Sequence, residues 1–224
     1  MQFLKSTVGR KLLMTVTGFA MLGFVTVHLL GNFSVYAGAD GINAYASKLQ
    51  GLGSFVWLFR LLMLTLFSVH VFFGIQLTLE NRSAKPLSYA VKKTLSTTFA
   101  GKNMIWTGLI LFAFLIYHLL HFTIHITNPE ISSGVNIDAS GRPDVFKMVV
   151  LSFQNTAISL IYIGAMTALV LHLFHGIQSL FQTLGLNNDR TMPVITKAGR
   201  IAAVVIFLGY IFIPIVIFAG ILKG

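Results

Sequence analysis

Apolar residues along this chain fall into five long runs, separated by shorter stretches that carry most of the charged residues. Each run is long enough for a helix that crosses a bilayer, which needs about 20 residues. The fourth run is longer than one crossing requires, so we expect it to tilt or to carry an interfacial extension. The pattern predicts an all-α integral membrane bundle, one domain over 1–224, with helices near 12–35, 54–79, 103–127, 148–183 and 200–222.

Composition supports the membrane assignment and narrows the possible chemistry. Hydrophobic residues make up 55% of the chain and charged residues only 10%, which is unusual for a soluble domain. The net charge of +10 comes from short stretches between the apolar runs, which argues against a nucleic-acid-binding face. The absence of cysteine excludes an iron–sulfur cluster, a thiolate-ligated haem and a haem attached through cysteines.

Basic residues lie mostly on one side of the predicted membrane. Because lysine and arginine favour cytoplasmic loops, the bias predicts a cytoplasmic N-terminus and an external C-terminus in a bacterial cytoplasmic membrane. On the inner side would lie Lys5, Arg10, Lys11, Arg82, Lys85, Lys92, Lys93, Lys102, Arg190, Lys197 and Arg200. On the outer side would lie Lys48, Arg60, Arg142, Lys147 and Lys223.

Each of the first four apolar runs has a histidine deep inside it: His28, His70, His118 and His172. An imidazole in hydrocarbon is costly without a partner, and two imidazoles from different helices can hold a haem iron from both faces. At about 1.5 Å per residue, His28 and His118 lie about 23 Å above the inner boundary, and His70 and His172 about 15 Å. The pattern predicts two histidine pairs, an outer and an inner one, each holding a haem b.

These histidines also allow other interpretations. A single intramembrane histidine more often bonds to a neighbouring helix or relays protons, but four at matched depths favour the di-haem interpretation. His121 and His175 follow His118 and His172 by three residues, so either member of each pair could ligate by geometry alone. The unused imidazole could bond to a haem propionate or a quinone carbonyl, or simply pack near the bilayer edge. His125 is expected to be an ordinary solvated histidine at the outer boundary.

The chain resembles the five-helix cytochrome b subunits of succinate dehydrogenases and fumarate reductases that combine one anchor polypeptide with two haems. The resemblance covers essentially the whole chain and rests on the order and spacing of four motifs. These are His28-Leu29-Leu30-Gly31-Asn32, His70-Val71-Phe72-Phe73-Gly74, Tyr117-His118-Leu119-Leu120-His121-Phe122 and His172-Leu173-Phe174-His175-Gly176.

The resemblance implies a role for each histidine. His28 and His118 correspond to the ligands of the distal haem, and His70 and His172 to those of the proximal haem, in preference to His121 and His175. It also implies an iron–sulfur subunit and a flavoprotein subunit on the cytoplasmic face, in a heterotrimer that could pair as a dimer. The dicarboxylate chemistry would lie on those subunits.

The family also exchanges electrons with a quinone, commonly menaquinone. Asn32, His121 and His125 near the outer pair are the candidate quinone contacts. Some members place a glutamate two residues before the proximal ligand of the fourth helix, where this chain has Val170. A proton path of that glutamate type is therefore not expected.

Two other functions remain open from the sequence. The chain could be the cytochrome b anchor of a hydrogenase or formate dehydrogenase, and the subunits that co-purify with it would distinguish these cases. It could instead be a haem-free transporter that uses histidines as a proton relay, which would show no Soret absorbance. Such a transporter favours broken helices or an inverted repeat, and the only proline well inside a predicted helix is Pro214.

Overall fold

The computed structural model describes residues 6–84, 98–132 and 135–223. Within these residues the fold is helical, and β pairing is limited to a single bridge between Ile137 and Pro143. Five of the described helices are long and apolar enough to cross a membrane, which confirms the predicted all-α membrane bundle. They are α2 (Thr7–Asn32), α4 (Ser54–Ser83), α6 (Met104–Phe122), α8 (Thr156–Thr183) and α9 (Thr191–Phe218).

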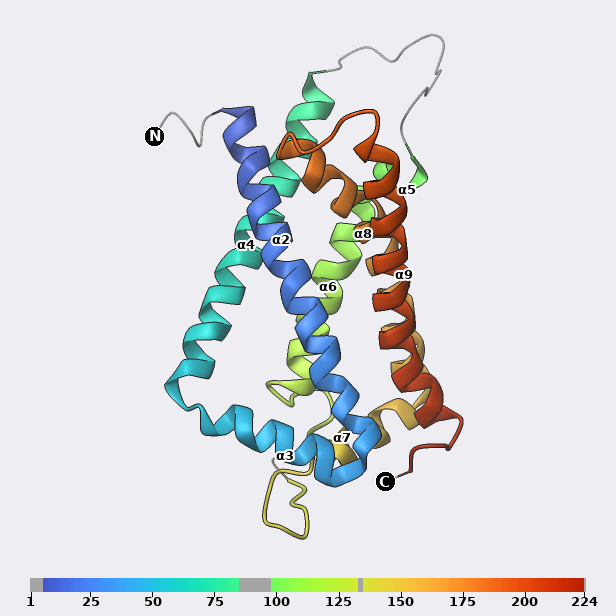
Figure 1. The fold of residues 1–224 in the computed structure, drawn as a ribbon. Helices are drawn as coiled ribbons and strands as arrows, with labels where there is room; N and C mark the ends of the chain where they lie inside the picture. Colours follow the sequence, from blue (N-terminus) through green and yellow to red (C-terminus); the bar gives the residue numbers. More distant parts are fainter. Residues whose placement is uncertain (1–5, 85–97, 133–134, 224) are drawn as a thin grey trace.

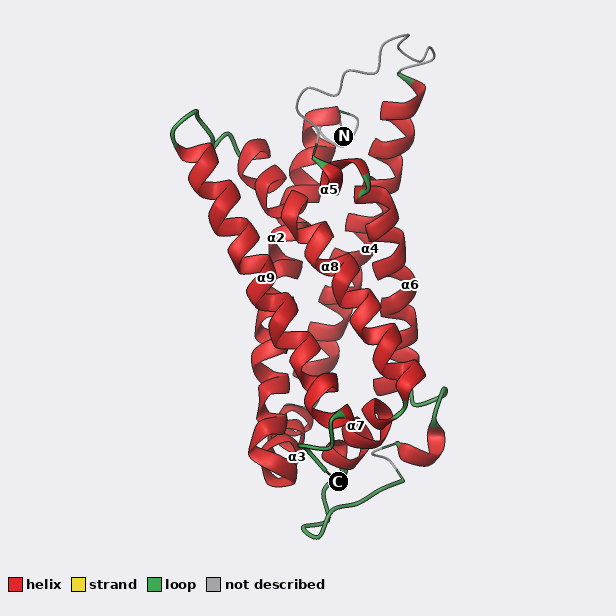
Figure 2. Ribbon diagram, turned by 90° about the vertical axis from the view of Figure 1, so that its right-hand side faces the viewer, coloured by secondary structure: helices red, strands yellow, loops and turns green. Residues whose placement is uncertain are grey.

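Shorter helices connect the long ones and gather mainly at one end. They are η1 (Phe33–Ala37), α3 (Gly38–Gly51), α5 (Phe99–Lys102), η2 (Pro129–Ile131) and α7 (Val145–Gln154). Figure 1 shows α3, α7 and the C-terminus at the lower end of the bundle, and the N-terminus at the upper end. Figure 2 shows the same division of the connecting segments from the side. The termini therefore lie at opposite ends, as five crossings require.

The predicted fourth helix, 148–183, is two helices, α7 and α8, that meet at Asn155. Asn155 has extended backbone angles (φ −77°, ψ 118°), and its side-chain oxygen accepts from the amides of Ala157 (3.0 Å) and Ile158 (3.3 Å). It is therefore the N-cap of α8. The extra length is a separate helix and not a tilted continuation.

The other helix bounds also differ from the predicted ones. The first helix begins at Thr7 and not near 12, because Ser6 caps it by accepting from the Gly9 amide at 3.0 Å. The second continues to Ser83, the third ends at Phe122, and the last spans Thr191–Phe218 where 200–222 was expected. Polar residues at helix ends lower the local hydropathy without ending the helix, which accounts for the starts of α2 and α9 that were placed too late and the end of α4 that was placed too early. The predicted ends at 127 and 222 lie beyond the observed ones, because apolar residues continue past the ends of α6 and α9.

The four histidine-bearing helices form a ring. Helix α2 packs against α4 and α8, and α6 packs against the same two helices. It follows that α2 lies across the ring from α6, and α4 lies across from α8. No side chain of α4 is fully buried, and its main packing partner in the ring is α2.

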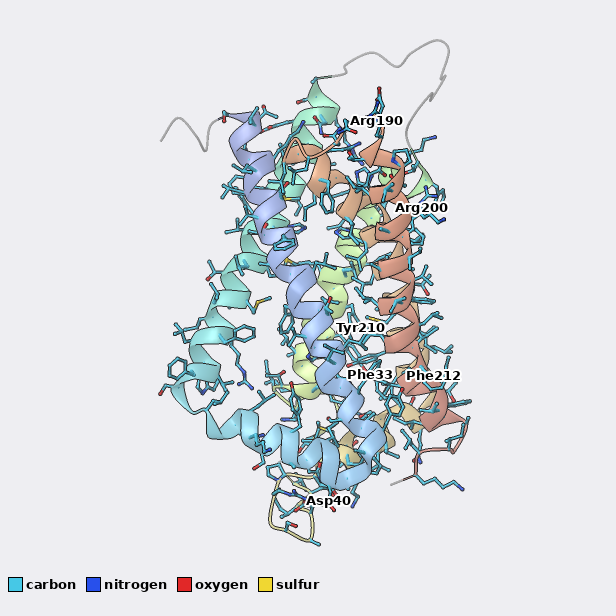
Figure 3. All side chains as sticks on the ribbon, viewed as in Figure 1. Phe33, Asp40, Arg190, Arg200, Tyr210 and Phe212 are labelled. Atoms are coloured by element: carbon cyan, nitrogen blue, oxygen red, sulfur yellow. The ribbon has the colours of Figure 1, made fainter. Side chains whose placement is uncertain are left out.

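Helix α9 lies outside the ring against α8 and α2. The Tyr210 hydroxyl on α9 donates to the backbone carbonyl of Val25 on α2 at 2.7 Å, and Figure 3 labels Tyr210 between these two helices. Buried apolar residues form one cluster around α7 and the adjoining ends of α8 and α9, and a smaller one nearer the other end of α8 and α9.

A polar cluster closes the end of the bundle that carries α3. The buried amide of Asn43 donates to Asp138 and Asp144, both at 3.2 Å, and its oxygen accepts from the Phe146 amide at 2.9 Å. Arg142 pairs with Asp40 and Asp138, each at 2.8 Å. Desolvation raises the pKa of Asp138, but hydrogen bonds from Arg142, Asn43 and Ser140 outweigh it and hold the pKa below its usual value.

A second ion pair joins α2 to α4 at the opposite end. Arg10 binds Glu80, and Gln76 donates to the same carboxylate at 3.0 Å. Figure 3 shows Arg190 and Arg200 at this end and Asp40 at the other. The side of the membrane that each end faces stays a prediction from the distribution of basic residues.

Candidate haem-binding centre

The four histidines meet as two pairs across the helix ring. The ring centroids of His28 on α2 and His118 on α6 are 6.0 Å apart. Those of His70 on α4 and His172 on α8 are 6.4 Å apart. Each pair joins helices on opposite sides of the ring, and these are the pairs that the depth estimate predicts.

The spacing suits two imidazoles that share one metal ion. A metal–imidazole bond of about 2.0–2.1 Å and about 1.1 Å from nitrogen to ring centre put two opposed rings about 6.3 Å apart. Both observed separations are close to this value. Among the described residues there is no cluster of three or more metal-binding side chains, so each candidate site offers two protein ligands. Two axial imidazoles are what a haem iron needs from the chain.

A threonine hydroxyl sets the proton position on each inner histidine. The Thr17 hydroxyl donates to the Leu13 carbonyl at 2.7 Å, so its oxygen is left to accept from His70 Nδ1, 3.2 Å away. Thr107 donates to the Met104 carbonyl at 3.0 Å and lies 3.2 Å from His172 Nδ1. Both imidazoles are thereby assigned the Nδ1–H tautomer, which leaves the Nε2 lone pair for a metal.

Glycines beside these threonines let the imidazoles approach the neighbouring helix closely. A Cβ on Gly18 would lie 3.2 Å from His70 Cε1, and one on Gly108 would lie 3.4 Å from His172 Cε1. Each inner histidine is thus held by a Thr-Gly pair on the adjacent helix of the ring.

The outer pair has a different, asymmetric setting. His118 Nδ1 lies 3.3 Å from the Tyr162 hydroxyl, and His121 Nδ1 lies 3.0 Å from the same oxygen. His121 Nε2 is 3.1 Å from Ser152 Oγ, whose proton is donated to the Met148 carbonyl at 2.7 Å. His28 instead stacks on Phe24, with ring centroids 5.4 Å apart.

The other residues that the sequence suggests as contacts of a haem or quinone differ in burial and in hydrogen bonding. His121 is almost fully buried and has both ring nitrogens in hydrogen bonds, so neither is available to a metal. The Asn32 amide nitrogen donates to the His28 carbonyl at 2.8 Å, which leaves its side-chain oxygen for other partners. His175 packs against Gly101, where a Cβ would lie 3.1 Å from its Nδ1.

His125 differs from the solvated histidine that its position suggested. Its Nδ1 is buried without a hydrogen-bond partner among the described residues. Its backbone has φ +61°, and no other described non-glycine residue has a positive φ. A strained backbone with an unsatisfied nitrogen is more common at binding sites than in ordinary turns.

The Thr-Gly pairs belong to a repeated sequence motif that a hydropathy pattern does not reveal. Residues 14–30 and 104–120 share the pattern Met-x-x-Thr-Gly-x5-Phe-x3-His-Leu-Leu. Residues 70–76 and 172–178 share His-x-Phe-x-Gly-Ile-Gln. The helix pairs α2/α4 and α6/α8 are therefore two copies of one unit in the same orientation, and each histidine pair joins equivalent positions of the two copies. A search for inverted repeats misses this parallel repeat.

Two surface depressions in the described part of the chain lie away from the histidine pairs. One, of about 620 Å³, is lined by 189–201 at the start of α9 and includes Lys197 and Arg200. The other, of about 240 Å³, is an apolar depression between α8 and α9 beside Pro214. Neither contains any of the four paired histidines.

Comparison with known proteins agrees with the membrane fold. The profile of the succinate dehydrogenase/fumarate reductase transmembrane subunit family matches residues 3–101 and 81–213. Curated proteins and solved structures give no significant match. The profile favours this complex over the other respiratory complexes and over a transporter. The chain is thus a multi-pass membrane subunit of an oxidoreductase complex and belongs to the succinate dehydrogenase/fumarate reductase transmembrane subunit family.

Proposed function

We propose that this chain is the di-haem b anchor of its complex and links an iron–sulfur subunit to membrane quinone. The observation that carries the proposal is the pair of facing imidazoles at two levels of one helix ring, at 6.0 and 6.4 Å. His28 with His118 would hold the outer haem, and His70 with His172 the inner one. When bound, each haem supplies a one-electron couple between ferric and ferrous iron.

The residues of the chain account for how such a site would work. The apolar helices would exclude water from the haems, and the four imidazoles would hold them. Thr17 and Thr107 accept from Nδ1–H of the inner histidines, which keeps their rings oriented and raises their basicity as ligands. By resemblance to the family, the dicarboxylate reaction is assigned to the other subunits.

The quinone, menaquinone by resemblance to the family, is proposed to bind near the outer pair. His125 offers a buried nitrogen without a partner, and Asn32 offers a side-chain oxygen. A quinone headgroup needs one or two such groups beside an apolar surface. His125→Gln should raise the apparent KM for quinone and leave haem content unchanged; an unchanged KM would remove His125 from the site.

The partners and location follow the same proposal. The iron–sulfur and flavoprotein subunits would dock on the cytoplasmic side, at the end where the N-terminus and the basic residues lie. The chain would reside in the bacterial cytoplasmic membrane, in a heterotrimer that could dimerise. Co-purification of tagged chain with a covalent flavin or iron–sulfur protein tests the partners.

The test of the haem assignment is His70→Ala in the intact complex. Loss of an axial ligand should reduce the haem b content from two to one per chain in a pyridine haemochrome assay. Quinone-linked turnover should stop, while dye-linked oxidation of succinate by the soluble subunits continues. The control is Ser68→Ala, an exposed position on the same helix. Retention of both haems in His70→Ala would contradict the ligand set.

A further inference from the structure

The outer pair carries a hydrogen-bond network that the tandem repeat does not account for. Helix α6 follows α2 at a spacing of 90 positions, so the counterpart of His121 is Gly31. Helix α8 follows α4 at a spacing of 102 positions, so the counterpart of Tyr162 is Arg60, which is exposed beside Trp57. The network therefore contacts only His118, and His28 has no equivalent of it.

Ser152, at the end of this network, determines the direction of every hydrogen bond in it. Ser152 donates to the Met148 carbonyl at 2.7 Å, so its oxygen must accept from His121 Nε2–H. A neutral His121 then has an unprotonated Nδ1, which accepts from the Tyr162 hydroxyl at 3.0 Å. The Tyr162 oxygen in turn accepts from His118 Nδ1–H at 3.3 Å.

Packing holds the central tyrosine in place. The Tyr162 ring lies edge-on to Phe114 and Phe153, each with ring centroids 5.0 Å away, and the residue is buried. Ser152 is fully buried and belongs to α7, so the break at Asn155 is what brings it beside α6. A satisfied, buried network of this kind is rigid, and its members polarise one another.

We propose that Tyr162, supported by His121 and Ser152, is a positioning residue that fixes His118 as the Nδ1–H tautomer and lowers the reduction potential of the outer haem selectively. The inference rests on the proposed di-haem function. A hydrogen bond accepted from Nδ1–H makes the imidazole a stronger donor to iron and favours the ferric state. Its loss shifts the outer potential to a more positive value.

The test is a potentiometric titration of both haems in the purified complex, with EPR of the ferric state. Tyr162→Phe should shift one of the two potentials upward and change one low-spin ferric signal, with both haems retained. Thr107→Val, which removes the hydroxyl that accepts from His172 Nδ1–H, should shift the potential of the inner haem. Ser152→Ala, three hydrogen bonds away from His118, should shift the same potential as Tyr162→Phe by a smaller amount.

Two matched controls separate this effect from general loosening. Tyr210→Phe removes another tyrosine hydroxyl, one that donates to Val25 beside His28. Ser159→Ala removes another buried serine hydroxyl, which donates to the Phe153 carbonyl at 2.6 Å. Neither should shift the potential that Tyr162→Phe shifts.

The outcomes are distinguishable. A wild-type complex without haem b would overturn the proposed function itself. A wild-type complex with two haems, whose potentials and ferric signals are unchanged in both Tyr162→Phe and Ser152→Ala, would overturn the positioning role alone. Loss of haem in Tyr162→Phe leaves Ser152→Ala to decide, because Ser152 does not touch the paired histidine.

Discussion

Hydrogen bonds at individual residues distinguish histidines that the sequence leaves equivalent. His118 and His121 lie on nearly the same face of α6, and spacing alone cannot separate them. In the structure both nitrogens of His121 are in hydrogen bonds, whereas His118 uses only Nδ1 and faces His28. The difference depends on Tyr162 and Ser152, which are distant in sequence, so no local pattern could have predicted it.

Gly18 provides a test of the inner site at the level of one residue. In Gly18→Val, the new Cβ would lie 3.2 Å from His70 Cε1, and the two methyl groups would force the imidazole away. We expect haem b to fall from two to one per chain in a pyridine haemochrome assay. Gly23→Val on the same helix is the control, because nothing lies within 4 Å of its Cβ position. Equal haem content in the two variants would contradict the packing role.

At the scale of elements, hydropathy predicted the number of long helices but not where they begin and end. The run 148–183 is apolar on average despite the polar stretch Gln154-Asn155-Thr156, and the side chain that caps α8 at its break is Asn155. The parallel repeat explains why the histidines pair across the ring, since equivalent positions of two copies meet at its centre. The repeat was present in the sequence, whereas the Tyr162 network required the tertiary structure.

Asn155 provides a test of the helix break. Removing the cap in Asn155→Ala should destabilise the chain by about 1 kcal/mol, because two amides of α8 lose their acceptor. The midpoint temperature of thermal unfolding in detergent should then fall by about 2–4 °C. Asn155→Asp keeps an acceptor and should unfold near the wild-type temperature. Equal midpoints for Asn155→Ala and Asn155→Asp would show that the cap is not stabilising.

The polar cluster at the α3 end should depend on pH. Because the folded protein lowers the pKa of Asp138, the ionised carboxylate is stabilising at neutral pH, and this contribution is lost as the pH falls through the lowered value. Amide exchange of 136–144, corrected for intrinsic rates, should therefore accelerate at acid pH. Arg142→Met should show faster exchange already at neutral pH. Exchange independent of both changes would contradict the role of this ion pair.

At the scale of the whole molecule, the two ends of the bundle differ in charge, and the termini lie at opposite ends (Figure 1). The basic bias predicts that the end with Arg190 and Arg200 faces the cytoplasm (Figure 3). Alkaline phosphatase fused to the C-terminus should therefore be active, since it folds only outside the cytoplasm. An inactive C-terminal fusion, with an active one placed in the loop between α8 and α9, would reverse the orientation.

The central claim is that two pairs of histidines hold two haems. The most direct measurement is a dithionite-reduced minus oxidised spectrum of the purified complex, with a pyridine haemochrome assay for haem b per chain. The account predicts a sharp alpha band and two haems. One haem would remove one of the histidine pairs from the ligand set, and a complex without haem would contradict the claim altogether.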